Sequence, residues 1–195
     1  MYMQHKDEKI VYQGRIVELV EYPVEMDGKI IIFEKARRSP GVRLIIHTKD
    51  GKFILNREKR HELGLAEDLR LPGGKVFDSL TEYNEFLLNH NSEKEIQEKA
   101  KESAIREATE EAGVKPTKIE FLSVSKCGAT MEWDLYYFLV KEYEEVSKNL
   151  KDTESMEMVG TVVLSKDELK EKALSGVISE DRSVAVILKY LNKKL

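Results

Sequence analysis

Apolar and polar residues alternate through much of the first third of the chain, which is the period of a half-buried β-strand. Asp27-Gly28 and Lys49-Asp50-Gly51 interrupt this alternation with residue combinations typical of hairpin turns. Ser39-Pro40-Gly41 separates the two hairpins. The predicted strands of this part cover residues 10–12, 16–22, 30–35, 42–48 and 53–57.

Farther along, the hydrophobic period becomes that of amphipathic helices. Capping boxes of the form Ser-x-x-Glu begin at Ser79, Ser92 and Ser165, and Gly113 is expected to end the second helix. Residues 58–70 are predicted to be irregular. The expected helices cover residues 79–89, 92–112, 165–176 and 179–193, and further strands cover 119–125, 135–140 and 157–164, with a long charged stretch at 141–153.

Composition narrows the class of protein. A chain of 195 residues with 41% apolar residues can bury one substantial core, and its net charge of −4 is spread along the sequence, which argues against nucleic-acid binding. Cys127 is the single cysteine, so no internal disulfide forms, and we expect a buried thiol in a reducing compartment. No apolar run approaches 18 residues, and residues 1–7 lack a hydrophobic signal core. We therefore expect a cytoplasmic protein without membrane contact.

An acidic group in the second helix calls for a chemical explanation. Glu107, Glu110 and Glu111 share one face if the segment is α-helical, and like charges at this spacing cost about 0.2–0.5 kcal/mol per pair. A divalent cation reverses that cost, and clustered carboxylate oxygens suit Mg²⁺ or Mn²⁺. The alternative is a solvated acidic helix face.

The same segment resembles the signature of the Nudix hydrolases, which is G, five residues, E, seven residues, then R-E-apolar-x-E-E-x-G-apolar. The second half of the signature is matched in order by Arg106, Glu107, Ala108, Glu110, Glu111, Gly113 and Val114. Counting back past seven residues from Arg106 reaches Glu98, the expected acid. The first half departs from the pattern, because 23 residues instead of five separate Gly74 from Glu98.

The resemblance implies an α/β protein with the Nudix fold, an α/β/α sandwich around a mixed β-sheet. Residues 1–40 are similar to the antiparallel strand addition that serves dimer formation in the branch cleaving ADP-ribose and other nucleoside diphosphate sugars. Residues 41–195 then form the Nudix domain, with a helical insertion at about 75–97. The insertion is either a lid that selects the substrate or an extra surface element without a role in function.

The resemblance also assigns roles at the site. Glu107, Glu110 and Glu111 are the expected metal ligands, with a backbone carbonyl at Gly73 completing the shell. Arg106 is grouped with the catalytic residues, although the pattern favours a bracing role. The residues of the motif expected to be structural are Gly74, Glu98 and Gly113.

A general base must lie close to the attacking water. In the ADP-ribose branch it comes from a loop after the core strands, which indicates Glu154, with Glu157 second. Either residue could instead be an exposed loop acid. The remaining acids considered for this role are Glu132, Glu144 and Glu145.

Substrate contacts are predicted from arginine, since a guanidinium group matches phosphate geometry. Arg57, Arg60 and Arg38 are the candidates, against the alternative that each is simply solvated. Trp133 could stack on a base or belong to the core. The four histidines form no spaced cluster, so a histidine metal site is not expected.

Together these features predict Mg²⁺-dependent hydrolysis of the pyrophosphate bond in a nucleoside diphosphate linked to another group. ADP-ribose or a nucleotide sugar would yield a nucleoside monophosphate and a sugar phosphate, and the enzyme would be a homodimer. The alternatives are a nucleoside triphosphate pyrophosphatase of the same family and a non-catalytic Nudix-fold nucleotide-binding module. An isomerase has the least support, because its cysteine and glutamate have no clear positions here.

Overall fold

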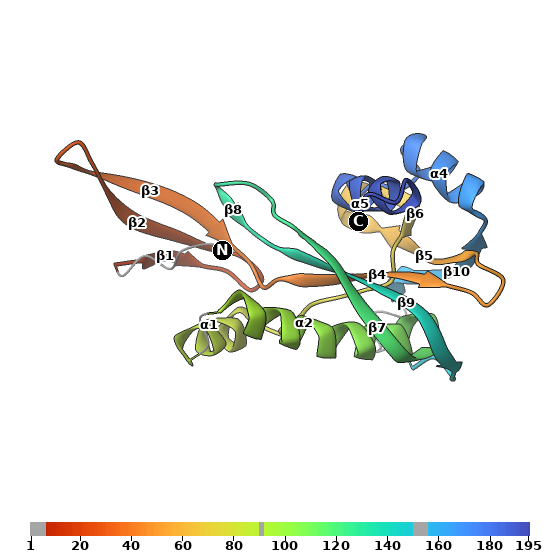
Figure 1. Ribbon diagram of the computed structural model, residues 1–195. Coiled ribbons are helices and arrows are strands. Elements are labelled where there is room, and N and C mark those ends of the chain that lie inside the picture. Colours follow the sequence, from red (N-terminus) through yellow and green to blue (C-terminus); the bar gives the residue numbers. More distant parts are fainter. Residues whose placement is uncertain (1–6, 90–91, 150–155) are drawn as a thin grey trace.

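The computed structural model describes residues 7–89, 92–149 and 156–195. Its strands form two sheets, of which one projects from the body of the molecule and the other lies between helices (Figure 1). Within the described residues, no helix is both long enough and apolar enough to cross a membrane.

The projecting sheet combines the three N-terminal strands with one short strand from later in the chain. Its strands are β1 (Lys9–Gln13), β2 (Glu18–Met26), β3 (Lys29–Arg37) and β8 (Met131–Glu132). Asp27 and Gly28 both have positive φ at the β2–β3 turn, which confirms the predicted hairpin. β8 pairs parallel to β3, so the sheet is not wholly antiparallel. A two-residue strand is too short to produce a period in the sequence.

The central sheet is mixed. Its order is β10-β5-β4-β9-β7 with β6 paired to β5, and β4 runs parallel to β9 while the other pairs are antiparallel. Its strands are β4 (Gly41–His47), β5 (Phe53–Arg60), β6 (Leu65–Arg70), β7 (Val114–Ser125), β9 (Leu135–Glu145) and β10 (Met158–Leu164).

The prediction of an irregular segment at residues 58–70 was wrong. β5 continues to Arg60, the short 3₁₀ helix η1 covers His61–Leu63, and β6 follows it. Ion pairs between strands, such as that of Arg57 with Glu67, allow charged side chains here. β9 likewise extends to Glu145 into the charged stretch, because pairing with β7 satisfies its backbone while its side chains stay mostly exposed.

Three of the four helices below begin at the predicted capping boxes, and α5 begins two residues after the predicted position 179. α1 covers Leu80–Asn89, α2 covers Glu93–Glu107, α4 covers Lys166–Leu174 and α5 covers Asp181–Leu191. Ser92 and Ser165 both form complete capping boxes with the glutamate three residues later. The chain after α2 widens into the π-helical turn η2 (Ala108–Ala112), and Gly113 ends it in the left-handed conformation.

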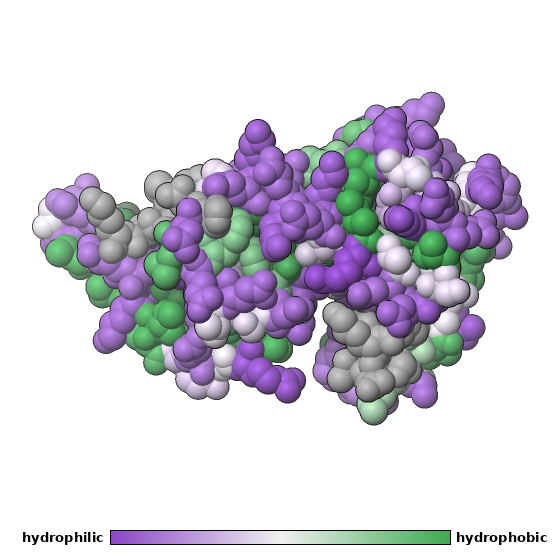
Figure 2. All heavy atoms as spheres, turned by 90° about the horizontal axis from the view of Figure 1, so that it is seen from below, coloured by the Kyte–Doolittle hydropathy of each residue, from purple (hydrophilic) through white to green (hydrophobic). Residues whose placement is uncertain are grey.

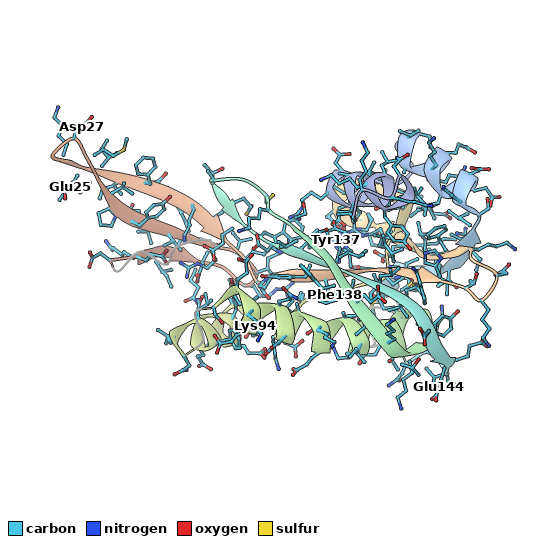
Figure 3. All side chains as sticks on the ribbon, in the orientation of Figure 1. Glu25, Asp27, Lys94, Tyr137, Phe138 and Glu144 are labelled. Atoms are coloured by element: carbon cyan, nitrogen blue, oxygen red, sulfur yellow. The ribbon has the colours of Figure 1, made fainter. Side chains whose placement is uncertain are left out.

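The two faces of the central sheet carry separate cores. Tyr137 and Phe138 are adjacent on β9 and point to opposite faces (Figure 3). Phe138 packs with alanines of α2, and Tyr137 packs with apolar residues of α4 and α5. These layers confirm the predicted α/β/α sandwich around a mixed sheet.

The single cysteine does not lie where the sequence suggested. Cys127 is exposed, in the segment between β7 and β8, and is a free thiol. The prediction of a buried thiol was therefore wrong. An isolated cysteine carries no hydrophobic period from which its burial could be read.

The inserted helix α1 joins the two parts of the molecule. Phe77 stacks near Tyr83 and Phe86, with ring centroids 5.1 and 4.9 Å away. Asn84 donates hydrogen bonds of 3.2 and 3.0 Å to the carboxylate of Glu18, which is fully buried on β2. The insertion is therefore packed between the projecting sheet and the core.

Apolar side chains remain exposed on the projecting sheet. Ile30 is 73% exposed, and Tyr12 and Ile32 are also accessible. Figure 2 shows hydrophobic residues on the surface at the end of the molecule that carries the β2–β3 hairpin and α1. This surface is the basis of the dimer proposal below.

Candidate metal and substrate site

The glycine loop, Leu71-Pro72-Gly73-Gly74-Lys75, runs beside the start of β4. Leu44 N donates to Pro72 O and Val42 N donates to Gly74 O, each at 2.9 Å. Gly73 N donates instead to Glu111 Oε2 at 2.8 Å. The loop therefore links β4 to the acidic end of the helical segment, whereas the metal-ligand role of the Gly73 carbonyl stays a prediction.

Both glycines of this loop are required by their surroundings. Gly73 has φ +151°, and a Cβ there would lie 2.1 Å from the carbonyl oxygen of Val42. A Cβ on Gly74 would lie 2.6 Å from the carboxyl group of Glu107. The chain thus brings backbone and carboxylates closer together than any side chain would permit.

The acidic residues straddle the change from α2 to η2. Glu107 and Glu111 are buried, whereas Glu110 is half-buried. The expectation that all three lie equivalently on one α-helical face was thus too simple, because the wider turn of a π-helix alters the angular spacing after Glu107. π-helical turns of this kind are frequent at functional sites.

Burial raises the pKa of Glu111 to about 8, and the negative charges of Glu107 and Glu58 add to the rise. Hydrogen bonds from Gly73 N and from Asn56 Nδ2, the latter 2.8 Å long, act in the opposite direction. Glu111 therefore sits in an environment that disfavours its negative charge. A bound divalent cation would favour the charged carboxylate and thereby lower the pKa of Glu111.

The donor set suits a hard divalent cation. Carboxylate oxygens, a closely approaching glycine backbone and repulsion between Glu107 and Glu111 are the features that Mg²⁺ exploits. Among the described residues, however, no group of three or more His, Cys, Asp or Glu side chains is assembled to hold a metal ion. The assignment of Glu107, Glu110 and Glu111 as metal ligands thus stays a prediction.

Arg106 braces the site. Its Nη2 donates to Glu107 Oε1 at 3.1 Å and to Lys75 O at 3.2 Å, which ties the helix to the glycine loop. Glu98 lies earlier on α2, nine residues before Glu107, and is exposed. A Cβ on Gly113 would come within 3.0 Å of Val146 O, so this glycine also allows a close approach of chain segments.

The acids nominated as the general base lie in different places. Glu154 falls outside the described residues, and Glu157 is exposed just before β10. Glu132 is buried against Lys35 in the projecting sheet, with a 2.8 Å ion pair. Glu145 is 3.6 Å from Lys49, and Glu144 is exposed at the end of β9 (Figure 3). The identity of the base stays a prediction.

An arginine cluster surrounds Trp133. The guanidinium groups of Arg38 and Arg182 each lie 4.2 Å from the centroid of the indole, and Arg182 Nη1 donates to Trp133 O at 2.7 Å. Burial lowers the pKa of Arg38, and nearby arginine charges, including that of Arg60, lower it further. The indole of Trp133 therefore holds both guanidinium groups through cation–π contacts.

Glu180, just before α5, extends this arginine cluster to Arg43 and Arg70. It accepts from Arg43 at 2.9 and 3.1 Å and from Arg70 at 2.9 Å. Although burial opposes ionisation, these arginines lower the pKa of Glu180 to about 2. The carboxylate is thus ionised at every pH at which the protein would work.

The predicted substrate arginines separate into two groups. Arg60 lies beside Glu58, with 3.3 Å between Nη1 and Oε2, and within the field of Arg38. Arg57 instead pairs with Glu67 on the exposed side of β5, one residue from Asn56 and therefore on the opposite face. The structure brings Arg38 and Arg60 together and leaves Arg57 apart.

Several residues of the site were not predicted from the sequence, because the hydrophobic period of the helices does not identify them. They are Arg43, Asn56, Glu58, Arg70, Glu180 and Arg182. The polar residues Asn56 and Glu58 share one face of β5 at the period of a strand, and this spacing could have drawn attention to them.

Comparison with known proteins agrees with this arrangement. The model of the NUDIX domain matches residues 37–183. A structure titled ADP compounds hydrolase is similar over 100% of this chain and 95% of its own, at 16% identity and a TM-score of 0.68. A NUDIX hydrolase from Nitrosomonas europaea is similar over 80% of this chain and 90% of its own, at 17% identity and a TM-score of 0.55. No curated protein matches in sequence.

The family model covers more than half of the chain, including the glycine loop, the acidic helix end and the arginine cluster. The structural likenesses extend that agreement to the fold. The chain therefore belongs to the NUDIX domain family and is a Nudix hydrolase.

Proposed function

We propose that this enzyme hydrolyses the pyrophosphate bond of a nucleoside diphosphate linked to a second group, with ADP-ribose or a nucleotide sugar as substrate. The observation that carries the proposal is the pair of buried carboxylates, Glu107 and Glu111, pressed against the glycine loop beside β4. This arrangement would gather metal and diphosphate at one place.

Mg²⁺, or Mn²⁺ in its place, would be held by Glu107 and Glu111, with Glu110 and the Gly73 carbonyl as further ligands. Bound there, it would supply charge neutralisation and lower the pKa of the attacking water. Arg106 keeps Glu107 in place through its 3.1 Å hydrogen bond. Glu154 is the first candidate to accept the proton, and Glu157 the second.

Arg38 and Arg60 are the proposed contacts to substrate phosphate. Each carries a permanent positive charge, and Arg43 and Arg182 add further positive charge around Arg38. Glu180 binds Arg43, whereas Arg38 stacks on Trp133 and Arg60 pairs with Glu58 and Glu62. We propose a weaker substrate role for Arg57, since it pairs with Glu67 on the face of β5 opposite Asn56.

The nucleotide-sugar branch is favoured by the projecting sheet. The structural likeness to a protein titled ADP compounds hydrolase extends over the whole chain, including this sheet. A nucleoside triphosphate pyrophosphatase of the same family is the second candidate, and its products would be a nucleoside monophosphate and pyrophosphate. A cytoplasmic location is proposed with either.

Turnover should be measured with Mg²⁺ across ADP-ribose, GDP-mannose, UDP-glucose, dinucleotides and nucleoside triphosphates, with products separated by chromatography. We expect nucleoside monophosphate and sugar phosphate from one of the diphosphates, and no turnover in EDTA. Release of pyrophosphate from a triphosphate alone would favour the second candidate. Ligand binding without turnover would identify a binding module.

A homodimer formed through the projecting sheet is also proposed. Replacement of Ile30 and Ile32 together by Lys should shift sedimentation from dimer to monomer at micromolar concentration, because both side chains are exposed and apolar. The matched control is replacement of the exposed Leu174 on α4, far along the chain, by Lys. A wild type that sediments only as monomer would contradict the proposal.

A further inference from the structure

The chain leaving β9 is fixed on the end of the acidic helical segment. Val146 N donates to Gly113 O at 2.9 Å, and Asn149 N donates to Glu110 O at 3.2 Å. These bonds satisfy carbonyl groups that a helix end would otherwise leave without partners. Residues between the two anchors are therefore held beside Glu110 and Glu111.

Lys148 lies between these anchors. Its Cγ and Cε atoms would be 3.1 and 3.7 Å from a Cβ built on Gly113, so its aliphatic part covers that glycine. Its Nζ donates to Thr161 Oγ1 on β10 at 3.3 Å. The side chain thus reaches from the helix end to the edge strand of the central sheet.

Thr161 brings the ammonium group close to the carboxylate site. It lies directly opposite Asn56 in the antiparallel pairing of β10 with β5. Directly opposed residues place their Cβ atoms on the same face, about 4.5–5.5 Å apart. Asn56 donates in turn to Glu111, so the four side chains form one continuous row from Lys148 to Glu111.

The charges agree with this geometry. Burial lowers the pKa of Lys148, and the negative charge of Glu111 acts against that effect. An ammonium group has three donors, and the bond to Thr161 uses one. Farther along β5, beyond Asn56, Arg60 pairs with Glu58. Lys148 thus lies across the strand pair from Asn56, and Arg60 lies farther along β5 from the same residue.

We propose that Lys148 binds a phosphate of the substrate, at the end of the row that runs from Glu111 through Asn56 and Thr161. The inference rests on the proposed hydrolysis of a diphosphate. With Lys148 near β10 and Arg60 farther along β5, two separate cations would each bind one phosphoryl group and hold the diphosphate in position. Thr161 is a positioning residue, because it holds the ammonium group without touching substrate.

Lys148 has a plainer explanation, since a cation near a helix C-terminus interacts favourably with the helix dipole. That role would affect stability and leave substrate binding unchanged. Lys148→Met separates the two, because methionine keeps the apolar cover over Gly113 and removes only the charge. Lys49→Met is the matched control, since Lys49 lines the same recess of about 440 Å³ but its side chain is 80% exposed.

Steady-state kinetics should be measured on the best substrate of the panel, together with calorimetric binding of adenosine 5′-(α,β-methylene)diphosphate. For Lys148→Met we expect kcat/KM to fall about 10- to 100-fold and the analogue to bind about 10-fold more weakly, with little change in Tm. Lys148→Arg should restore part of both, and Lys49→Met should match the wild type.

Outcomes for the two proposals differ. A wild type that cleaves no diphosphate overturns the proposed function. An active wild type with Lys148→Met equal to Lys49→Met overturns only the role of Lys148. A lower Tm for Lys148→Met with unchanged analogue binding assigns the residue to the helix end and also overturns its role in substrate binding.

Discussion

Replacement of Glu111 by Gln is expected to reduce turnover on the order of 10³-fold while making the metal-free protein more stable at pH 8. The amide would keep the shape of the side chain and could still accept from Asn56, but it would lose the charge proposed to hold Mg²⁺. The loss of activity follows from the loss of a proposed metal ligand. The gain in stability follows from the removal of a buried negative charge.

The sign of the stability change comes from the pKa of Glu111. In the folded protein it is raised to about 8 from an ordinary value of 4.5, so the folded state holds the proton more tightly than the unfolded chain does. The free energy of unfolding of the metal-free wild type should therefore contain a contribution that is full below pH 4.5. That contribution is lost as pH rises from 4.5 to about 8.

Urea denaturation in EDTA between pH 5 and pH 8.5 measures this effect. The wild type should lose on the order of 2–4 kcal/mol across the range relative to Glu111→Gln, which cannot ionise. Mg²⁺ should restore stability to the wild type more than to the variant. Glu102→Gln is the control on the same helix, because that side chain is 70% exposed. Equal pH slopes in wild type and Glu111→Gln would show that the folded environment does not disfavour this charge.

The parts of the fold that sequence predicts best are those determined by neighbouring residues. Ser92 with Glu95 begins α2, and Gly113 ends the helical segment in the left-handed conformation, as the capping box and the glycine indicated. The position of the acidic segment against the glycine loop followed from a signature, because hydrolases of this family share that motif. These features are local or repeated across a family.

The remaining features depend on contacts between distant residues. Glu180 is separated by 137 positions from Arg43 and by 110 from Arg70, and no local period relates them. The π-helical turn that changes the spacing of Glu110 and Glu111 after Glu107 also has no signature in residue type. β6 was missed because its exposed residues pair through charge rather than alternating with apolar ones.

The arginine cluster depends most on Glu180, and Glu180→Gln is expected to destabilise the protein by about 3–5 kcal/mol at pH 7. Arg43 and Arg70 would then remain buried with less negative charge to balance them. Glu67→Gln is the matched control, because Glu67 also pairs with an arginine but is 46% exposed, and its loss should cost at most about 1 kcal/mol.

The pH dependence of stability shows whether Glu180→Gln acts by removing the charge beside Arg43 and Arg70 or by disturbing the packing. Because the pKa of Glu180 is lowered to about 2 in the folded state, its contribution is present above pH 4.5 and is lost as pH falls towards 2. The difference in unfolding free energy between wild type and Glu180→Gln should therefore shrink across that window, as measured by urea denaturation. A difference that stays constant from pH 7 to about pH 2 would mean that the carboxylate acts through its shape and not through its charge on the arginines.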